Sequence, residues 1–172
     1  MYVESAGGGE HFLLAARPSG SAHLLSRDES GVNSVAERVG TLRRNFLGTQ
    51  WALYDEGSAP TKTGEHADGA HARYRGELGL VTWGQNVWGR PMPRKSALVL
   101  PELVGGMPRV SRPPLVANSM LICAREHRLD PDAHMILVSR EPTLDAATGR
   151  ASLDFGGRVT CPSVKNVQLV VS

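Results

Sequence analysis

Cysteine and long apolar runs are scarce in this sequence, and each scarcity excludes a class of protein. The two cysteines, Cys123 and Cys161, lie far apart and form no CxxC pattern, which disfavours a disulfide framework and a structural zinc site. The start shows no secretory signal pattern, so we expect a reducing, cytosolic compartment. The longest apolar stretches, such as 12–16 and 78–83, are far shorter than the ~20 residues of a spanning helix. Any membrane contact is therefore expected to be peripheral.

Catalytic motifs are also missing. The sequence contains no GxSxG elbow, HExxH pair or phosphate-binding P-loop, and no GxGxxG follows a predicted strand. His127 and His134 flank Asp130 and Asp132, but their spacing matches no standard metal motif, and the intervening Leu-Asp-Pro-Asp is typical of a turn. We therefore predict a protein that is not an enzyme and has no metal site or cofactor.

What the sequence does contain is a series of short apolar runs with β-type composition, separated by Gly, Pro, Asn and Asp residues that favour turns. Many short strands with frequent turns predict an antiparallel all-β sandwich or barrel rather than βαβ units. The predicted strands are Phe12–Ala16, Gln50–Tyr54, Gly79–Trp83, Ala97–Leu100, Met120–Ala124, Met135–Ser139, Ser152–Phe155 and Val167–Val171.

One segment has two interpretations. The run 34–37 resembles a capping box, and Val39, Leu42 and Phe46 continue at helical spacing, which favours a short amphipathic helix. Alternatively, residues 41–46 form a strand that enters a hairpin. The choice matters because Thr41 and Arg43 share one face of a strand but diverge on a helix.

The basic residues are more informative as clusters than as a total. The net charge is only +2, and aromatic residues make up 5% of the chain, so a nucleic-acid-binding surface is not expected. Arginine greatly outnumbers lysine, and its planar fork suits phosphate oxygens. Taken alone, however, such clusters are more typical of solvated strand edges, where charge prevents aggregation. The clusters are Arg43 and Arg44, Arg73 and Arg75, Arg90 with Arg94 and Lys95, and Arg158 with Lys165.

Five blocks of sequence resemble the tubby-like protein family, in the family's own order. Leu42 to Thr49, continuing to Leu53, Tyr54 and Asp55, is similar to the LRSN-type block of the family and the strand after it. Tyr74 to Leu78 is similar to the LRQEL element of the family. The other three blocks are Phe12 to Arg17; Asn86 to Gly89 with Pro93 to Lys95 and Val99 to Pro101; and Phe155 to Thr160 with Ser163 to Val170.

This resemblance implies a fold and a domain organisation. The family fold is a closed antiparallel β-barrel around an apolar C-terminal helix, so we expect an all-β, closed or partly closed barrel over residues 11–172. Residues 1–10 are expected to be a loose N-terminal segment. The chain ends soon after Val171, where the family continues into final strands and the central helix. The central helix is therefore expected to be missing from this chain.

The resemblance also implies a ligand site. In the family, basic residues of a K-L-R element and of LRQEL contact phosphatidylinositol 4,5-bisphosphate. Arg43 and Arg75 occupy two of these positions here, but Thr41 replaces the lysine. Each such cation near an anionic surface contributes about 1 kcal/mol, so its loss predicts roughly fivefold weaker binding unless a neighbour substitutes. Arg44 would point to the opposite face of a strand. Further support for a basic face is expected from Arg44, Arg73, Arg94 and Lys95.

The functional expectation is therefore a non-enzymatic, monomeric adaptor that docks on phosphoinositide headgroups. It would be cytoplasmic and peripheral at the inner face of the plasma membrane, with nuclear or ciliary residence as further sites. Two alternatives stay open, namely a protein-interaction or transcription-linked role with protein cargo or transport partners, and a non-functional truncated remnant.

Overall fold

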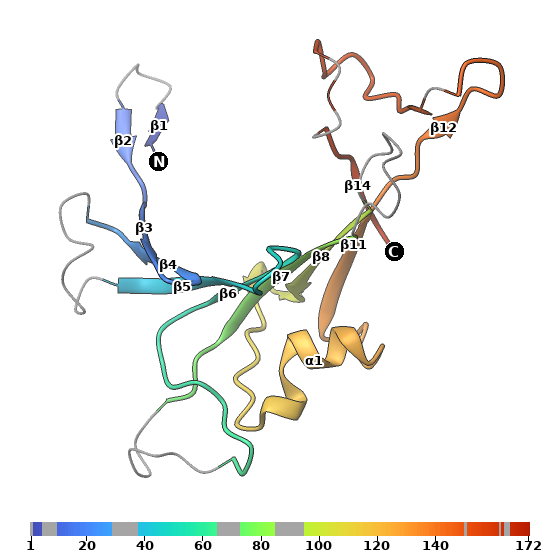
Figure 1. Ribbon diagram of the computed structural model, residues 1–172. Helices are drawn as coiled ribbons and strands as arrows, with labels where there is room; N and C mark the ends of the chain where they lie inside the picture. The colour runs from blue at the N-terminus through green and yellow to red at the C-terminus, as the bar shows by residue number, and fades with distance from the viewer. Residues whose placement is uncertain are drawn as a thin grey trace.

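A computed structural model of the 172-residue chain describes residues 2–4, 10–28, 38–64, 73–84, 95–149, 151–161, 163 and 166–172. Its main feature is one antiparallel sheet of eight strands (Figure 1). In spatial order these are β14 (Leu169–Val171), β11 (His134–Ser139), β8 (Ser96–Pro101), β7 (Glu77–Trp83), β6 (Gln50–Tyr54), β5 (Arg38–Arg44), β4 (Ala22–Ser26) and β3 (Ala15–Ser19). The prediction of an all-β antiparallel fold is confirmed.

Short elements complete the described chain. The two-stranded pairs are β1 (Tyr2–Glu4) with β2 (Glu10–Phe12), β9 (Leu103–Val104) with β10 (Met107–Pro108), and β12 (Thr143–Leu144) with β13 (Ala151–Ser152). A 3-10 turn, η2 (Val116–Asn118), leads into the helix α1 (Met120–Arg125). Residues 2–4 are thus paired strand within the segment that was expected to be loose. Among the described residues, no helix is both long and apolar enough to cross a membrane.

The predicted strand Met120–Ala124 is wrong, because these residues form α1. A short apolar run has the same pattern in a buried strand and in a buried helix. Here two side chains satisfy amide groups at the helix N-terminus. The Oγ of Ser119 accepts from the amide of Ile122 at 3.5 Å, and Oε2 of Glu77 accepts from the amide of Met120 at 2.6 Å. Satisfying these amides favours the helix.

The choice between helix and strand at residues 34–46 is settled for residues 38–44, which the structure describes as a strand. Residues 38–44 are the strand β5, paired with β4 and β6, so the helical interpretation is wrong there. The capping-box residues 34–37 lie outside the described residues. Elsewhere β6 matches its predicted bounds, and the predicted strand Phe12–Ala16 is divided between β2 and β3.

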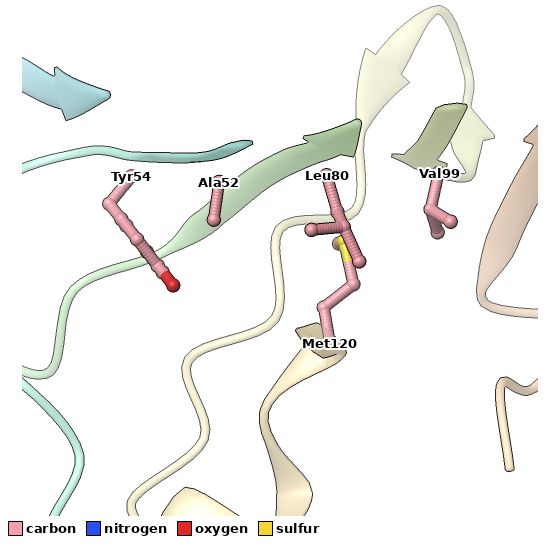
Figure 2. Close-up of a cluster of buried hydrophobic side chains, with 5 residues drawn as sticks. All are labelled: Ala52, Tyr54, Leu80, Val99 and Met120. Atoms are coloured by element: carbon pink, nitrogen blue, oxygen red, sulfur yellow. The ribbon is translucent and has the colours of Figure 1, made fainter. Parts of the chain in front are cut away.

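The core lies between the sheet and α1. Ala52 and Tyr54 of β6, Leu80 of β7 and Val99 of β8 alternate onto one face of the sheet and point towards Met120 of α1 (Figure 2). Leu80 is only 1% exposed. We call this side of the sheet the α1 face.

The opposite face of the sheet is also apolar. Strand alternation places Leu42, Leu53, Val81, Leu98 and Leu137 there, and each is half-buried rather than buried. In the part of the chain that is described, β3 and β14 are the two edges of the sheet, so closure into a barrel is not seen.

Candidate functional site

The strand β5 places two of the predicted phosphate-binding residues on one face. Thr41 lies opposite Tyr54, and Arg43 lies opposite Ala52. Since Tyr54 and Ala52 belong to the core cluster, Thr41 and Arg43 also project from the α1 face. By strand alternation, the side chain of Arg44 leaves the backbone on the face opposite to that of Arg43.

Arg75 reaches the same place from a different part of the chain. It lies in the segment that enters β7, and its guanidinium carbon is 3.8 Å from the centre of the Tyr54 ring. Such a cation–π contact stabilises by about 0.5–2 kcal/mol, depending on desolvation. Because Tyr54 is also the cross-strand neighbour of Thr41, this contact brings Arg75 beside the β5 residues.

Together these residues border a cavity of about 390 Å³, which we call the arginine cavity. Its walls come from β3 to β6, from the turn after β6 and from the segment before β7. The lining residues are Ser19, Ala22, Leu24, Arg38, Thr41, Arg43, Tyr54, Asp55, Glu56, Gly57 and Arg75. The structure therefore places Arg43, Arg75 and Thr41 around one cavity, on one side of the molecule.

The electrostatics of the arginine cavity favour an anion. Burial lowers the pKa of Arg75, and the charge of Arg43 lowers it further, although Tyr54 and Glu77 act in the opposite direction. Its Nε atom is buried and has no hydrogen-bond partner among the described residues. Two neighbouring guanidinium groups on one cavity provide the positive charge and the N–H donors that phosphate oxygens accept from.

Asp55 fixes the backbone around Arg75. Its carboxylate accepts hydrogen bonds from the Gly76 amide and from both terminal nitrogens of Arg112, with Nη1 at 3.0 Å. Arg112 Nη1 also donates to the carbonyl of Tyr74 at 2.8 Å. We call this set the Asp55–Arg112 clasp. Burial opposes the ionisation of Asp55, but the bonds from Arg112 and Gly76 and the charges of Arg112 and Arg73 outweigh it, so its pKa is lowered.

Gly57 brings a second loop against the same segment. Its backbone φ of 136° is one that residues other than glycine rarely adopt. A Cβ added at this position would lie 2.7 Å from the Arg75 amide nitrogen. The Arg75 amide in turn donates to the carbonyl of Ser58 at 3.0 Å. The position of Arg75 therefore depends on glycine at this turn.

The described residues predicted as a supporting basic face do not line one common cavity. Arg44 is exposed and borders a second cavity of about 250 Å³, which Arg43 and Arg75 also line. Arg73 is exposed and forms an ion pair with Asp55 at 3.3 Å. Lys95 pairs with Glu141 and lines neither cavity. Arg94 lies outside the described residues, as do Arg90 and Lys165.

Sequence reasoning missed Tyr54, Asp55, Arg112 and Arg38. The sequence places Tyr54 in a predicted strand, and Tyr54 and Asp55 in a family-like block, but gives neither a role at the site. The alternation of Tyr54 with Ala52 could have shown that Tyr54 shares a face with its neighbours on the next strand. No sequence signal joins Asp55 to Arg112, because they are 57 positions apart. The orientation of Arg38 depends on a shift in the register between β4 and β5, which the sequence of β5 alone does not show.

The His127–His134 segment forms the turn that the sequence predicts. The carboxylate of Asp130 accepts from the Asp132 amide at 2.9 Å, and a His134 ring nitrogen lies 3.1 Å from the Asp130 carbonyl oxygen. Within the described ranges, no group of three or more His, Cys, Asp or Glu residues could hold a metal ion.

Comparison with known proteins shows the family of this chain. The Tub family profile matches residues 1–172. The chain is 34% identical to human Tubby-related protein 2 over 175 aligned positions, which cover 99% of this chain and 33% of that protein. It is 35% identical to Tubby protein homolog 1 of Caenorhabditis elegans, with 92% and 38% covered, and 31% identical to human Tubby-related protein 3, with 99% and 39% covered. The chain spans about a third of the length of these relatives. It belongs to the Tub family.

Proposed function

We propose that this chain is a non-enzymatic module that binds the phosphatidylinositol 4,5-bisphosphate headgroup at a membrane surface. The observation that supports the proposal is the convergence of Arg43, Arg75 and Thr41 on one cavity from strands and loops far apart in the sequence. Charge-assisted hydrogen bonds from guanidinium groups to phosphate oxygens are short and directional.

A bound phosphate would also relieve the unfavourable features of the free cavity. The charge of Arg43 disfavours that of Arg75, and an anion between them would favour both charged forms. Arg75 is held by the Tyr54 ring and by the backbone bonds described above. Less side-chain entropy is therefore lost when this residue binds a ligand.

The proposal places the protein in the cytoplasm, as a monomer at the inner face of the plasma membrane. Nuclear or ciliary residence is also compatible with this proposal. A protein cargo could bind at the same time, because the proposed membrane-binding residues lie on only one side of the sheet.

The Arg43→Ala/Arg75→Ala double variant should bind vesicles that contain phosphatidylinositol 4,5-bisphosphate about thirtyfold more weakly. This corresponds to about 1 kcal/mol for each of the two cations lost. Sedimentation with phosphatidylcholine vesicles, with and without the bisphosphate lipid, measures the effect. Vesicles with phosphatidylserine at equal surface charge separate headgroup recognition from general attraction.

The matched control is Arg109→Ala/Arg140→Ala, which removes the same charge from two exposed arginines that line neither cavity. It should retain nearly all of the binding. Equal sedimentation of the wild-type chain and the Arg43/Arg75 variant would refute the proposed function.

We also propose that the sheet forms the wall of a closed barrel, as the apolar face opposite α1 suggests. The filled interior of a barrel needs such a face. Eight strands about 4.8 Å apart would place β3 and β14 up to ~34 Å from each other in an open sheet. Spin labels at positions 16 and 171, with Cys123 and Cys161 replaced by serine, should report a much shorter distance in a closed barrel. A distance close to the open value would contradict closure.

A further inference from the structure

Arg38 lines the arginine cavity although strand alternation alone would point it away. On a regular strand, Thr41 and Arg43 face one side, and residue 38 faces the other. The register between β4 and β5, which lie side by side in Figure 1, shifts at this point. Leu25 lies opposite Gly40, but Ser26 lies opposite Arg38, so Val39 is an extra residue on β5.

This one-residue bulge reverses the alternation at the start of β5. Bulges re-aim side chains in this way, and they occur often near functional sites. As a result Arg38 shares the cavity with Thr41, Arg43 and Arg75. It is the third arginine of the cavity.

The charge of Arg38 is not neutralised by the described residues around it. Arg38 is half-buried and forms no ion pair with another described residue. Of the two carboxylates that border the cavity, Asp55 is already bonded to Arg112 and Arg73. The other, Glu56, is exposed. Three arginines and one exposed carboxylate leave the cavity with a net positive charge.

We propose that Arg38 is the third phosphate-binding side chain of this site and supplies the cation that the neutral Thr41 lacks. The inference rests on the proposed phosphoinositide function and extends it. Three guanidinium groups from three positions around one cavity can donate to more than one phosphate group, which suits an inositol ring with at least two phosphates. The shared chemistry is a polyphosphorylated inositol, either as a lipid headgroup or free in solution.

The test uses the full chain and the Arg38→Gln variant, which keeps most of the side-chain length but removes the charge. We expect about fivefold weaker binding, the effect of one cation. Two probes distinguish the ligand sources, namely vesicles with phosphatidylinositol 4,5-bisphosphate in sedimentation and free inositol 1,4,5-trisphosphate in calorimetry. Arg140→Gln is the matched control and should bind like the wild-type chain.

A rescue variant separates ligand binding from a structural role. Thr41→Lys added to Arg38→Gln places a cation in the same cavity, so it should restore most of the affinity for both probes. Thermal unfolding of each variant shows whether the fold is retained. A loss that Thr41→Lys does not restore, accompanied by a lower unfolding temperature, would mean that Arg38 is structural and would overturn the inference.

The remaining outcomes are also decisive. If the wild-type chain binds and Arg38→Gln binds equally well, the inference about Arg38 fails while the proposed function stands. If Arg38→Gln loses binding to vesicles but not to the free trisphosphate, Arg38 attracts the membrane surface rather than the ligand, and the inference again fails. If the wild-type chain binds neither probe, the proposed function itself fails.

Discussion

Replacing Leu80 with alanine should lower the free energy of unfolding by about 3 kcal/mol. Leu80 is 1% exposed and lies between Ala52 and Val99, facing Met120 of α1 (Figure 2). Truncation of a buried leucine costs the lost burial of its methyl groups and leaves a cavity, and such changes typically cost 2–5 kcal/mol. Because Leu80 is at the centre of the contact between sheet and helix, the surrounding side chains have little freedom to fill the gap.

Urea unfolding followed by circular dichroism measures this change. Leu144→Ala is the matched control, because Leu144 is 58% exposed on the β12 strand, and it should change the stability by less than about 0.5 kcal/mol. Similar effects of the two substitutions would show that α1 does not pack on the sheet as described. Leu80 also lines the second cavity beside Arg43 and Arg75, so a loss of headgroup binding should accompany the loss of stability.

Replacing Arg112 with alanine should destabilise the chain by about 2 kcal/mol and also weaken headgroup binding, although Arg112 lines neither cavity. The substitution removes a charged partner of Asp55 and the donor to the Tyr74 carbonyl. Hydrogen bonds to charged groups contribute about 1.5–3 kcal/mol. Arg112 is 27% exposed and Asp55 is 20% exposed, so water compensates in part. Without the clasp, the backbone on both sides of Arg75 is held less firmly.

Arg109→Ala is the matched control for this prediction, since Arg109 is a near neighbour whose ion pair, to Glu102, is long at 3.8 Å and exposed. Its effect should be within about 0.5 kcal/mol. Unchanged stability and unchanged vesicle binding in Arg112→Ala would contradict the role of the clasp.

The Asp55–Arg112 clasp should also make the free energy of unfolding fall at acidic pH. The pKa of Asp55 is lowered in the folded chain, so between the folded and unfolded pKa values the unfolded chain binds more protons. The contribution of Asp55 is therefore complete above its unfolded pKa and is lost as the pH falls through the folded pKa. Unfolding measured between about pH 6 and about pH 2 should show a shallower acid dependence in Asp55→Asn than in the wild-type chain.

Glu77 has the opposite effect on the pH dependence of stability, because its pKa is raised in the folded chain. Burial raises its pKa, although the Met120 amide and Arg75 oppose this. Its contribution to stability is thus present at low pH and is lost as the pH rises through its folded pKa. If Asp55→Asn and the wild-type chain show the same pH dependence, Asp55 does not have the lowered pKa on which the acid prediction depends.

The features that the sequence predicted correctly are local. Short runs with turn residues between them indicated an antiparallel all-β fold, and β6 was predicted with its observed bounds, because both signals depend on neighbouring residues. Once β5 is a strand, its period of two also places Thr41 and Arg43 on one face. The composition of 120–124 could not distinguish a strand from α1, since the helix depends on Glu77, 43 residues away.

By itself, then, the sequence determined the fold class, the family-like blocks and the residue types that could bind phosphate. Only the tertiary structure decided that Arg75 lies over Tyr54, that Asp55 and Arg112 hold its backbone, and that a bulge turns Arg38 into the cavity. The physical reason is that these contacts join residues far apart in the chain. Their free energy depends on which strands become neighbours and in what register, and this information is not present in any single segment.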